Sequence, residues 1–201
     1  MTMNGILDEA QAMHLVEPKT RAWTAQEYDQ MDELGWFEGQ RVQLVDGEII
    51  IMSPQNFSHS VAVDRISKLL DRAVGEQYWV RSQLPLVLSG NSEPEPDISV
   101  VSGKREDYTD HPTTAILVIE VSDSTLSFDR GQKCRDYARA GIAHYWIVNL
   151  TNRSIEVYSR SVAGTPSDDW TYDGPSIIHA GEPIAFPAPP HLRFDAGELL
   201  P

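Results

Sequence analysis

The stretch that decides the fold is Ala115-Ile-Leu-Val-Ile-Glu-Val-Ser122, which is apolar on both of its alternating faces except at Glu120. A strand that is covered on both faces of a sheet has this pattern, so we expect a strand here with further layers on both sides. Glu120 interrupts the pattern, because a buried carboxylate has to be paired, neutralised or bound to a metal. The sequence therefore marks Glu120 as a candidate functional residue.

A second carboxylate, Asp97, occupies a similar position. It follows Pro94-Glu-Pro96 and precedes Ile98-Ser-Val-Val101, a strand-like run whose start is fixed by proline. Carboxylates at the ends of two neighbouring strands could converge on one hard cation, which takes oxygen ligands. Two carboxylates with waters suit magnesium, whereas zinc would require more nitrogen or sulfur ligands.

Helix and turn signals place further elements around these two strands. Asp46-Gly47 is the strongest hairpin signal in the chain, and a glycine follows each of the three helical patterns. We expect helices at about 24–34, 58–74 and 128–140, a hairpin at 41–52, and strands at 77–88, 97–101, 115–121, 144–149 and 154–158. This order predicts an α/β fold (α+β, mixed sheet), a mixed β-sheet flanked by helices. Residues 1–20 are expected to form a flexible arm, and residues 21–201 a single domain.

Composition restricts the classes of protein that this chain can represent. The apolar runs are too short to span a bilayer, so we expect a soluble cytoplasmic protein with no membrane contact. The single cysteine, Cys134, allows no internal disulfide. A net charge of −14 argues against a nucleic-acid partner, although a local groove could be positive or be neutralised by divalent ions.

Two further side chains have two interpretations each. His59 falls on the inner face of the helix predicted at 58–74, near its start, either as a hydrogen-bonded core residue or as part of a site. Lys133 lies one helical turn from Asp129 and from Tyr137. It could form an exposed ion pair with Asp129, or it could reach over the end of the Glu120 strand and hold an attacking water or offset phosphate charge. The spacing does not decide between these alternatives.

The chain resembles the PD-(D/E)XK nuclease superfamily through Pro96-Asp97 and Glu120-Val121-Ser122, with Ser122 where that motif usually has lysine. Within it, one bacterial family of restriction endonucleases, long catalogued as a domain of unknown function, shows the same departure. The resemblance covers roughly residues 22–160 and rests on the order and spacing of these motifs: Asp46-Gly47-Glu48, Ser53-Pro54, His59, Pro96-Asp97, Glu120-Val121-Ser122, Asp129, Lys133, Tyr137, Gly141-Ile142 and Tyr145-Trp146-Ile147-Val148.

The resemblance implies a restriction-endonuclease-like core and a metal-dependent phosphodiesterase site. Asp97 and Glu120 would ligate Mg²⁺ or Mn²⁺, the Val121 carbonyl would add a ligand, and Lys133 would replace the missing motif lysine. The first core helix of the superfamily often brings an acidic residue to the metal, and His59 stands at the corresponding end here. Related sequences often have glutamate where this chain has the neutral Gln43, so the role of a third carboxylate is in question. Glu48 is available, or is a solvated strand position.

We therefore predict a metal-dependent endonuclease that cleaves DNA, expected to be duplex, with Asp97, Glu120, Lys133 and His59 as its catalytic residues. One alternative is a catalytically silent acidic binding or scaffold module of the same fold. Another is a phosphoesterase acting on RNA or nucleotides. A homodimer would suit a duplex with two strands to cut.

Overall fold

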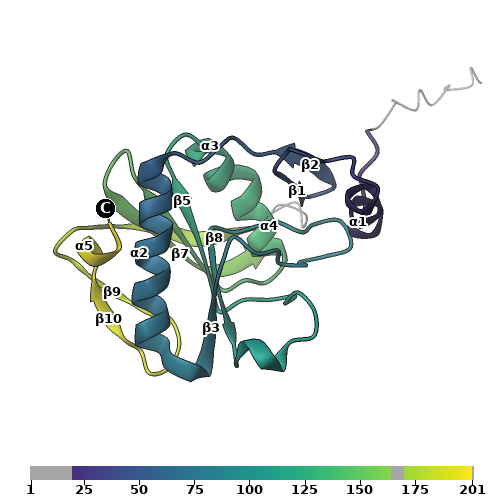
Figure 1. Cartoon of the computed structure of the whole chain (residues 1–201). Helices are drawn as coiled ribbons and strands as arrows, with labels where there is room; N and C mark the ends of the chain where they lie inside the picture. The colour runs from purple at the N-terminus through teal and green to yellow at the C-terminus, as the bar shows by residue number, and fades with distance from the viewer. Residues whose placement is uncertain (1–19, 164–169, 201) are drawn as a thin grey trace, which may run out of the picture.

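The computed structural model describes residues 20–163 and 170–200, and its centre is a six-stranded mixed sheet (Figure 1). The strand order is β3-β4-β5-β6-β7-β8; β5 and β6 run parallel, and the other neighbouring pairs are antiparallel. The strands are β3 (Tyr78–Ser82), β4 (Ile98–Ser102), β5 (Leu117–Ser122), β6 (His144–Asn149), β7 (Ser154–Ala163) and β8 (Trp170–His179). The predicted mixed sheet flanked by helices is confirmed.

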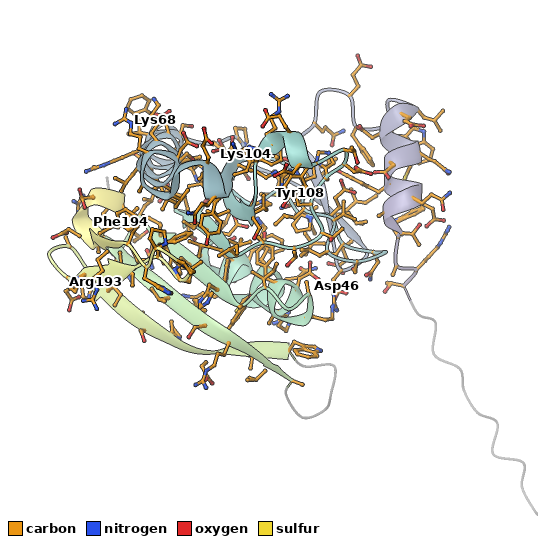
Figure 2. All side chains as sticks on the ribbon, turned by 90° about the horizontal axis from the view of Figure 1, so that it is seen from below. Asp46, Lys68, Lys104, Tyr108, Arg193 and Phe194 are labelled. Atoms are coloured by element: carbon orange, nitrogen blue, oxygen red, sulfur yellow. The ribbon has the colours of Figure 1, made fainter. Side chains whose placement is uncertain are left out.

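Helices and two small hairpins surround this sheet. The helices are α1 (Ala25–Glu33), α2 (Phe57–Val74), α3 (Leu126–Phe128), α4 (Cys134–Arg139) and α5 (Ala196–Leu199), with a π-helical turn over Asp129–Lys133 and 3-10 turns over Gly75–Gln77 and Arg105–Asp107. The hairpins pair β1 (Val42–Val45) with β2 (Glu48–Ile51), and β9 (Pro183–Ala185) with β10 (Arg193–Asp195). Figure 2 shows Asp46, in the β1–β2 turn, on the side of the molecule opposite Arg193 and Phe194 of β10.

Alternation along β5 divides the interior into two cores. Leu117, Ile119 and Val121 contribute to the core under α2, which α5 and the β9–β10 hairpin complete. Val118 contributes to the core under α4. Because successive side chains of a strand point to opposite faces, Glu120 lies on the α4 side. All six residues of β5 are buried, as the double-sided apolar pattern predicted.

The long helix α2 crosses one face of the sheet (Figure 1). Asn56 caps its first turn, because the side-chain oxygen accepts a hydrogen bond from the backbone N–H of His59 at 2.9 Å. Its buried residues are Ala62, Val63, Ile66, Leu70 and Val74, at the spacing of one helical face. This packing fixes the direction in which the first turn, with His59, faces the sheet.

The hairpin turn at Asp46-Gly47 forms as predicted. Asp46 has φ 50° and Gly47 has φ 77°, so both residues adopt the left-handed conformations that a two-residue type I′ turn requires. A Cβ added at Gly47 would lie 2.5 Å from the Cβ of Ala22. Glycine is therefore required here both by the backbone conformation and by the close approach of the chain before α1.

The structure corrects two details of the sequence analysis. The strand expected at 77–88 ends at Ser82. The helix expected at 128–140 starts at Leu126 and is interrupted by the π turn. The predicted arm, apart from residue 20, lies outside the described residues. Within the described ranges, no helix combines the length and apolar character needed to cross a membrane.

Candidate active site

Asp97 and Glu120 meet where β4 begins and β5 ends. The register pairs Ile98 with Ile119, so the antiparallel strands bring Asp97 beside Glu120. Asp97 accepts a hydrogen bond through Oδ2 from the backbone N–H of Val121 at 2.9 Å. Its own backbone N–H lies 3.4 Å from Oε2 of Glu120. The sequence prediction that these two carboxylates converge agrees with this geometry.

His59 reaches the same point from α2. Its Nε2 lies 2.9 Å from Oδ1 of Asp97, and its side chain is largely buried. Gln83, which sequence reasoning missed, donates from Nε2 to the same Oδ1 at 3.3 Å. Gln83 follows β3 with φ 53°, a conformation that a non-glycine residue seldom adopts and that often marks functional sites. No sequence pattern signals this contact.

Lys133 approaches Glu120 from the opposite layer. Its Nζ lies 2.7 Å from Oε1 of Glu120, and the two side chains are each only 3% exposed. The hydroxyl of Tyr137 donates to the same Oε1 at 2.7 Å. The predicted alternative, an exposed ion pair between Asp129 and Lys133, is therefore wrong. Both residues are buried, and Lys133 pairs with Glu120.

The π turn explains how these donors reach the strand end. A π turn inserts one extra residue into a helix, and such turns occur frequently at functional sites. Lys133 ends the turn, and Tyr137 lies one turn later on the same helical face. The turn is anchored from below, because the Tyr145 hydroxyl donates to the carbonyl of Asp129 at 3.0 Å. Thr125 donates to the Asp129 carboxylate at 2.7 Å.

The contacts shift the pKa values of the two carboxylates in opposite directions. Burial raises the pKa of Asp97, but the hydrogen bond and charge of His59, with Lys133 and the Val121 amide, more than offset it, so the net pKa is lowered. Burial raises the pKa of Glu120 to about 8 although Lys133 opposes the shift. Burial lowers the pKa of Lys133, yet Glu120, Asp129 and Asp97 raise it overall. Asp97 is thus the firmly ionised member of the pair.

The pKa of His59 is shifted in the opposite direction to that of Asp97. Burial lowers its pKa, but the hydrogen bond and charge of Asp97, together with Glu120, raise it overall. The pair His59–Asp97 therefore favours an imidazolium facing a carboxylate. Such a contact fixes the orientation of the carboxylate and leaves the imidazole able to exchange a proton with the pocket.

A narrow pocket of about 70 Å³ opens onto these groups. It has room for several water molecules or an ion with waters. Arg41 and Asn56 line it beside the site residues, and Asp123 and Asp129 add further carboxylates. The pocket therefore combines oxygen ligands with a few fixed hydrogen-bond donors.

The donor set fits a hard cation that keeps part of its hydration shell. Within residues 20–163 and 170–200, no three histidine, cysteine, aspartate or glutamate side chains converge as a metal cage. Asp97 and Glu120 each retain oxygen lone pairs that can bind a cation. If the antiparallel pairing of Ile98 with Ile119 is continued by two residues, Pro96 lies opposite Val121. Proline has no N–H to donate, so the Val121 carbonyl gains no ladder partner from it. Two carboxylates and a carbonyl suit magnesium with several waters better than zinc.

Comparison with known proteins identifies the family. The family model described as "Uma2: Putative restriction endonuclease" matches residues 25–184, which is most of the chain. The chain belongs to the Uma2 family. The search of curated proteins found no match.

A solved structure supports the same fold for this Uma2 protein. The crystal structure of a "putative nuclease belonging to DUF820" from Anabaena variabilis ATCC 29413 aligns with a TM-score of 0.62 at 14% sequence identity. The alignment covers 84% of the present chain and 96% of the other. At this identity the likeness concerns the fold, which agrees with the restriction-endonuclease-like core inferred from the motifs.

The remaining residues of the motifs in this Uma2 chain lie partly at the pocket and partly away from it. Gln43 is buried and lines the pocket, where its Oε1 accepts the backbone N–H of Glu95 at 3.1 Å. Glu48 is exposed and bonds to Gln132, so it is a solvated strand position. Trp146 and Tyr145 are buried core residues. Tyr137 is also buried, and its contact with Glu120 makes it part of the site.

Proposed function

We propose that this Uma2 protein is a magnesium- or manganese-dependent endonuclease that hydrolyses phosphodiester bonds of duplex DNA. The observation that carries the proposal is the convergence of Asp97, Glu120 and Lys133 on one pocket at the ends of two strands. The family description and the nuclease fold of the structural neighbour support the same class of reaction. The lysine comes from the helical layer and occupies the place beside the glutamate that Ser122 cannot fill.

Asp97, Glu120 and the Val121 carbonyl would hold the metal. When bound, the ion would supply Lewis acidity, polarising the phosphoryl group and offsetting the charge that develops on it. Asp97 is suited to this task because its lowered pKa keeps it ionised at neutral pH. Burial raises the pKa of Glu120, whereas the Lys133 ammonium and the Tyr137 hydroxyl that donate to it favour the ionised form that a ligand requires.

The side chains around the carboxylates position and supply protons. Lys133 keeps its charge through its acidic neighbours, so its ammonium can hold a water or a phosphate oxygen beside Glu120. Tyr137 fixes the Glu120 carboxylate through its hydroxyl. His59 orients Asp97 and offers an exchangeable proton at 2.9 Å. These groups are held by packed secondary structure, which preorganises the site before substrate binds.

The silent binding module remains the competing function, and one observation favours it. The net charge is −14, and the pocket itself carries Glu95, Asp123 and Asp129 in addition to the proposed ligands. Such a field repels phosphate unless cations neutralise it. A module of this kind would keep the fold, would bind no divalent ion at the pocket and would cleave no nucleic acid.

The decisive experiment combines metal binding with cleavage. Purified protein would be incubated with supercoiled duplex DNA, single-stranded DNA and RNA in Mg²⁺, Mn²⁺ or EDTA, and Mg²⁺ binding would be measured by calorimetry. We expect metal-dependent nicking of the duplex that falls by at least about a hundredfold in Asp97→Asn and Lys133→Met. Glu48→Gln, an exposed control, should retain activity.

Different results identify the alternatives. Cleavage that survives Asp97→Asn would overturn the site assignment. Absence of both metal binding and cleavage in the wild-type protein would favour the silent module. Preference for RNA would place the same chemistry on a different substrate class.

A further inference from the structure

A second cleft lies beside the candidate active site. It has a volume of about 580 Å³ and runs between α1, the residues before β1 and the loops at residues 85–87 and 110–111. Arg41 and Glu95 line both this cleft and the catalytic pocket, so the two cavities share a wall. The volume falls in the range of small-molecule sites. The nuclease proposal uses none of the other residues of this cleft.

Carboxylates dominate the lining of this acidic cleft. Five carboxylates line the cleft together with one guanidinium, that of Arg41, which is paired with Glu95 at 3.2 Å. The other four carboxylates are Asp29, Asp32, Glu93 and Asp110. The cleft therefore presents an excess of negative charge on opposing walls. It would attract and retain a cationic ligand.

Glu93 is the side chain that requires an explanation. It is 8% exposed, lines the cleft, and is held in place by backbone bridging to Leu44. Among the residues that the structure describes, none donates a hydrogen bond or forms an ion pair to its carboxylate. Burial, together with Asp29, Asp110 and Glu95, raises its pKa to about 7. An unpaired buried carboxylate is costly, and a cation at this position would remove that cost.

The spread of the lining carboxylates favours an extended cation over a single metal ion. No three acidic or histidine side chains of the described ranges lie close enough together to cage a metal, so the carboxylates of the cleft are spread out. Between them lie apolar surfaces from Val42, Pro85 and Val87. Alkyl chains bury favourably on such surfaces, while ammonium groups pair with the carboxylates.

We propose that the acidic cleft binds a linear polyamine, with one ammonium group on Glu93 and another on the carboxylates of α1 or Asp110. The methylene segments lie on the apolar wall between them. This inference does not depend on the nuclease assignment, because it uses a different cavity and different carboxylates.

Calorimetry with spermidine tests the proposal in the full chain at pH 8 and low salt, where Glu93 is ionised. We expect saturable binding at one site that weakens at least about tenfold in Glu93→Gln, since a charge-assisted hydrogen bond is lost. Asp97→Asn, which alters the catalytic pocket alone, should bind like the wild type. Butylamine, with one ammonium group, should bind at least about tenfold more weakly than spermidine.

A second variant guards against loss of folding. Asp29→Asn changes an exposed residue of α1 and should weaken binding about twofold to fivefold without altering the melting curve. Equal affinity of the wild type and Glu93→Gln would overturn the proposal, as would heats that never saturate, which indicate diffuse counterion binding to an acidic protein. Loss of binding in Asp97→Asn would move the ligand to the catalytic pocket and overturn it as well.

Discussion

Removing either partner of the buried pair Glu120–Lys133 should destabilise the fold, and the two losses should change with pH in opposite directions. In Glu120→Gln, the Lys133 ammonium loses its partner, and neutralising a lysine of ordinary pKa 10.5 at pH 7 costs up to about 5 kcal/mol. In Lys133→Met, Glu120 has to take up a proton, which against its ordinary pKa of 4.5 costs up to about 3 kcal/mol at pH 7. Each variant also loses a hydrogen bond, which costs about 1–2 kcal/mol.

Urea unfolding at pH 7 and at pH 9.5 measures this asymmetry. At pH 7 Glu120→Gln should be less stable than Lys133→Met by roughly 1–2 kcal/mol. At pH 9.5 the difference in stability between the two variants should narrow or change sign. In Glu120→Gln the unpaired lysine then loses its proton at little cost, whereas in Lys133→Met the unpaired Glu120 has to be held protonated above its pKa. The double variant should recover stability relative to Glu120→Gln. Equal losses at pH 7, or no change in the gap with pH, would refute the reasoning.

Two further predictions concern positions outside the pair. Gly47→Ala should lower the free energy of unfolding by about 3 kcal/mol and Gly35→Ala by about 1 kcal/mol, because both glycines have positive φ but only Gly47 lies against Ala22. Chemical denaturation compares the two variants, and similar losses would contradict a role for the contact with Ala22. Glu93→Gln should raise the free energy of unfolding by roughly 1–3 kcal/mol over the wild type at pH 8 but not at pH 4. The folded pKa of about 7 exceeds the unfolded one near 4.5, so the penalty for burying the charge develops between these two pH values. Thermal melts at both pH values measure the difference, and a pH-independent difference would count against this prediction.

The strands and their polar exceptions were predictable because both depend on local pattern. The run Ala115 to Ser122 is apolar on both faces, and such a strand can only lie inside a sheet covered on two sides. Glu120 within that run, and Asp97 after Pro96, had to be satisfied by something. The structure places the two residues together through the β4–β5 register. The sequence indicated which carboxylates to consider and, through the resemblance, which lysine.

The partners of those carboxylates were less accessible to sequence reasoning. Lys133 had two interpretations because helical spacing alone places it near Asp129, and burial against Glu120 excludes the exposed pair. The π turn that directs it has no sequence signature, since its hydrogen bonds depend on how the helix packs. Gln83 gave no signal at all, because its contact with Asp97 depends on an unusual backbone conformation after β3.

The sequence by itself determined the central strands, the long capped helix, the type I′ turn and the two acidic residues that interrupt apolar or proline-bounded runs. These features follow from period, turn chemistry and the cost of burying charge, all of which act over a few residues. Only the tertiary structure decided what faces those acids, which ammonium pairs with Glu120, and that Glu93 lies buried in a separate acidic cleft. Such contacts join residues far apart in the chain, so their distances are set by packing of the layers and by no local preference.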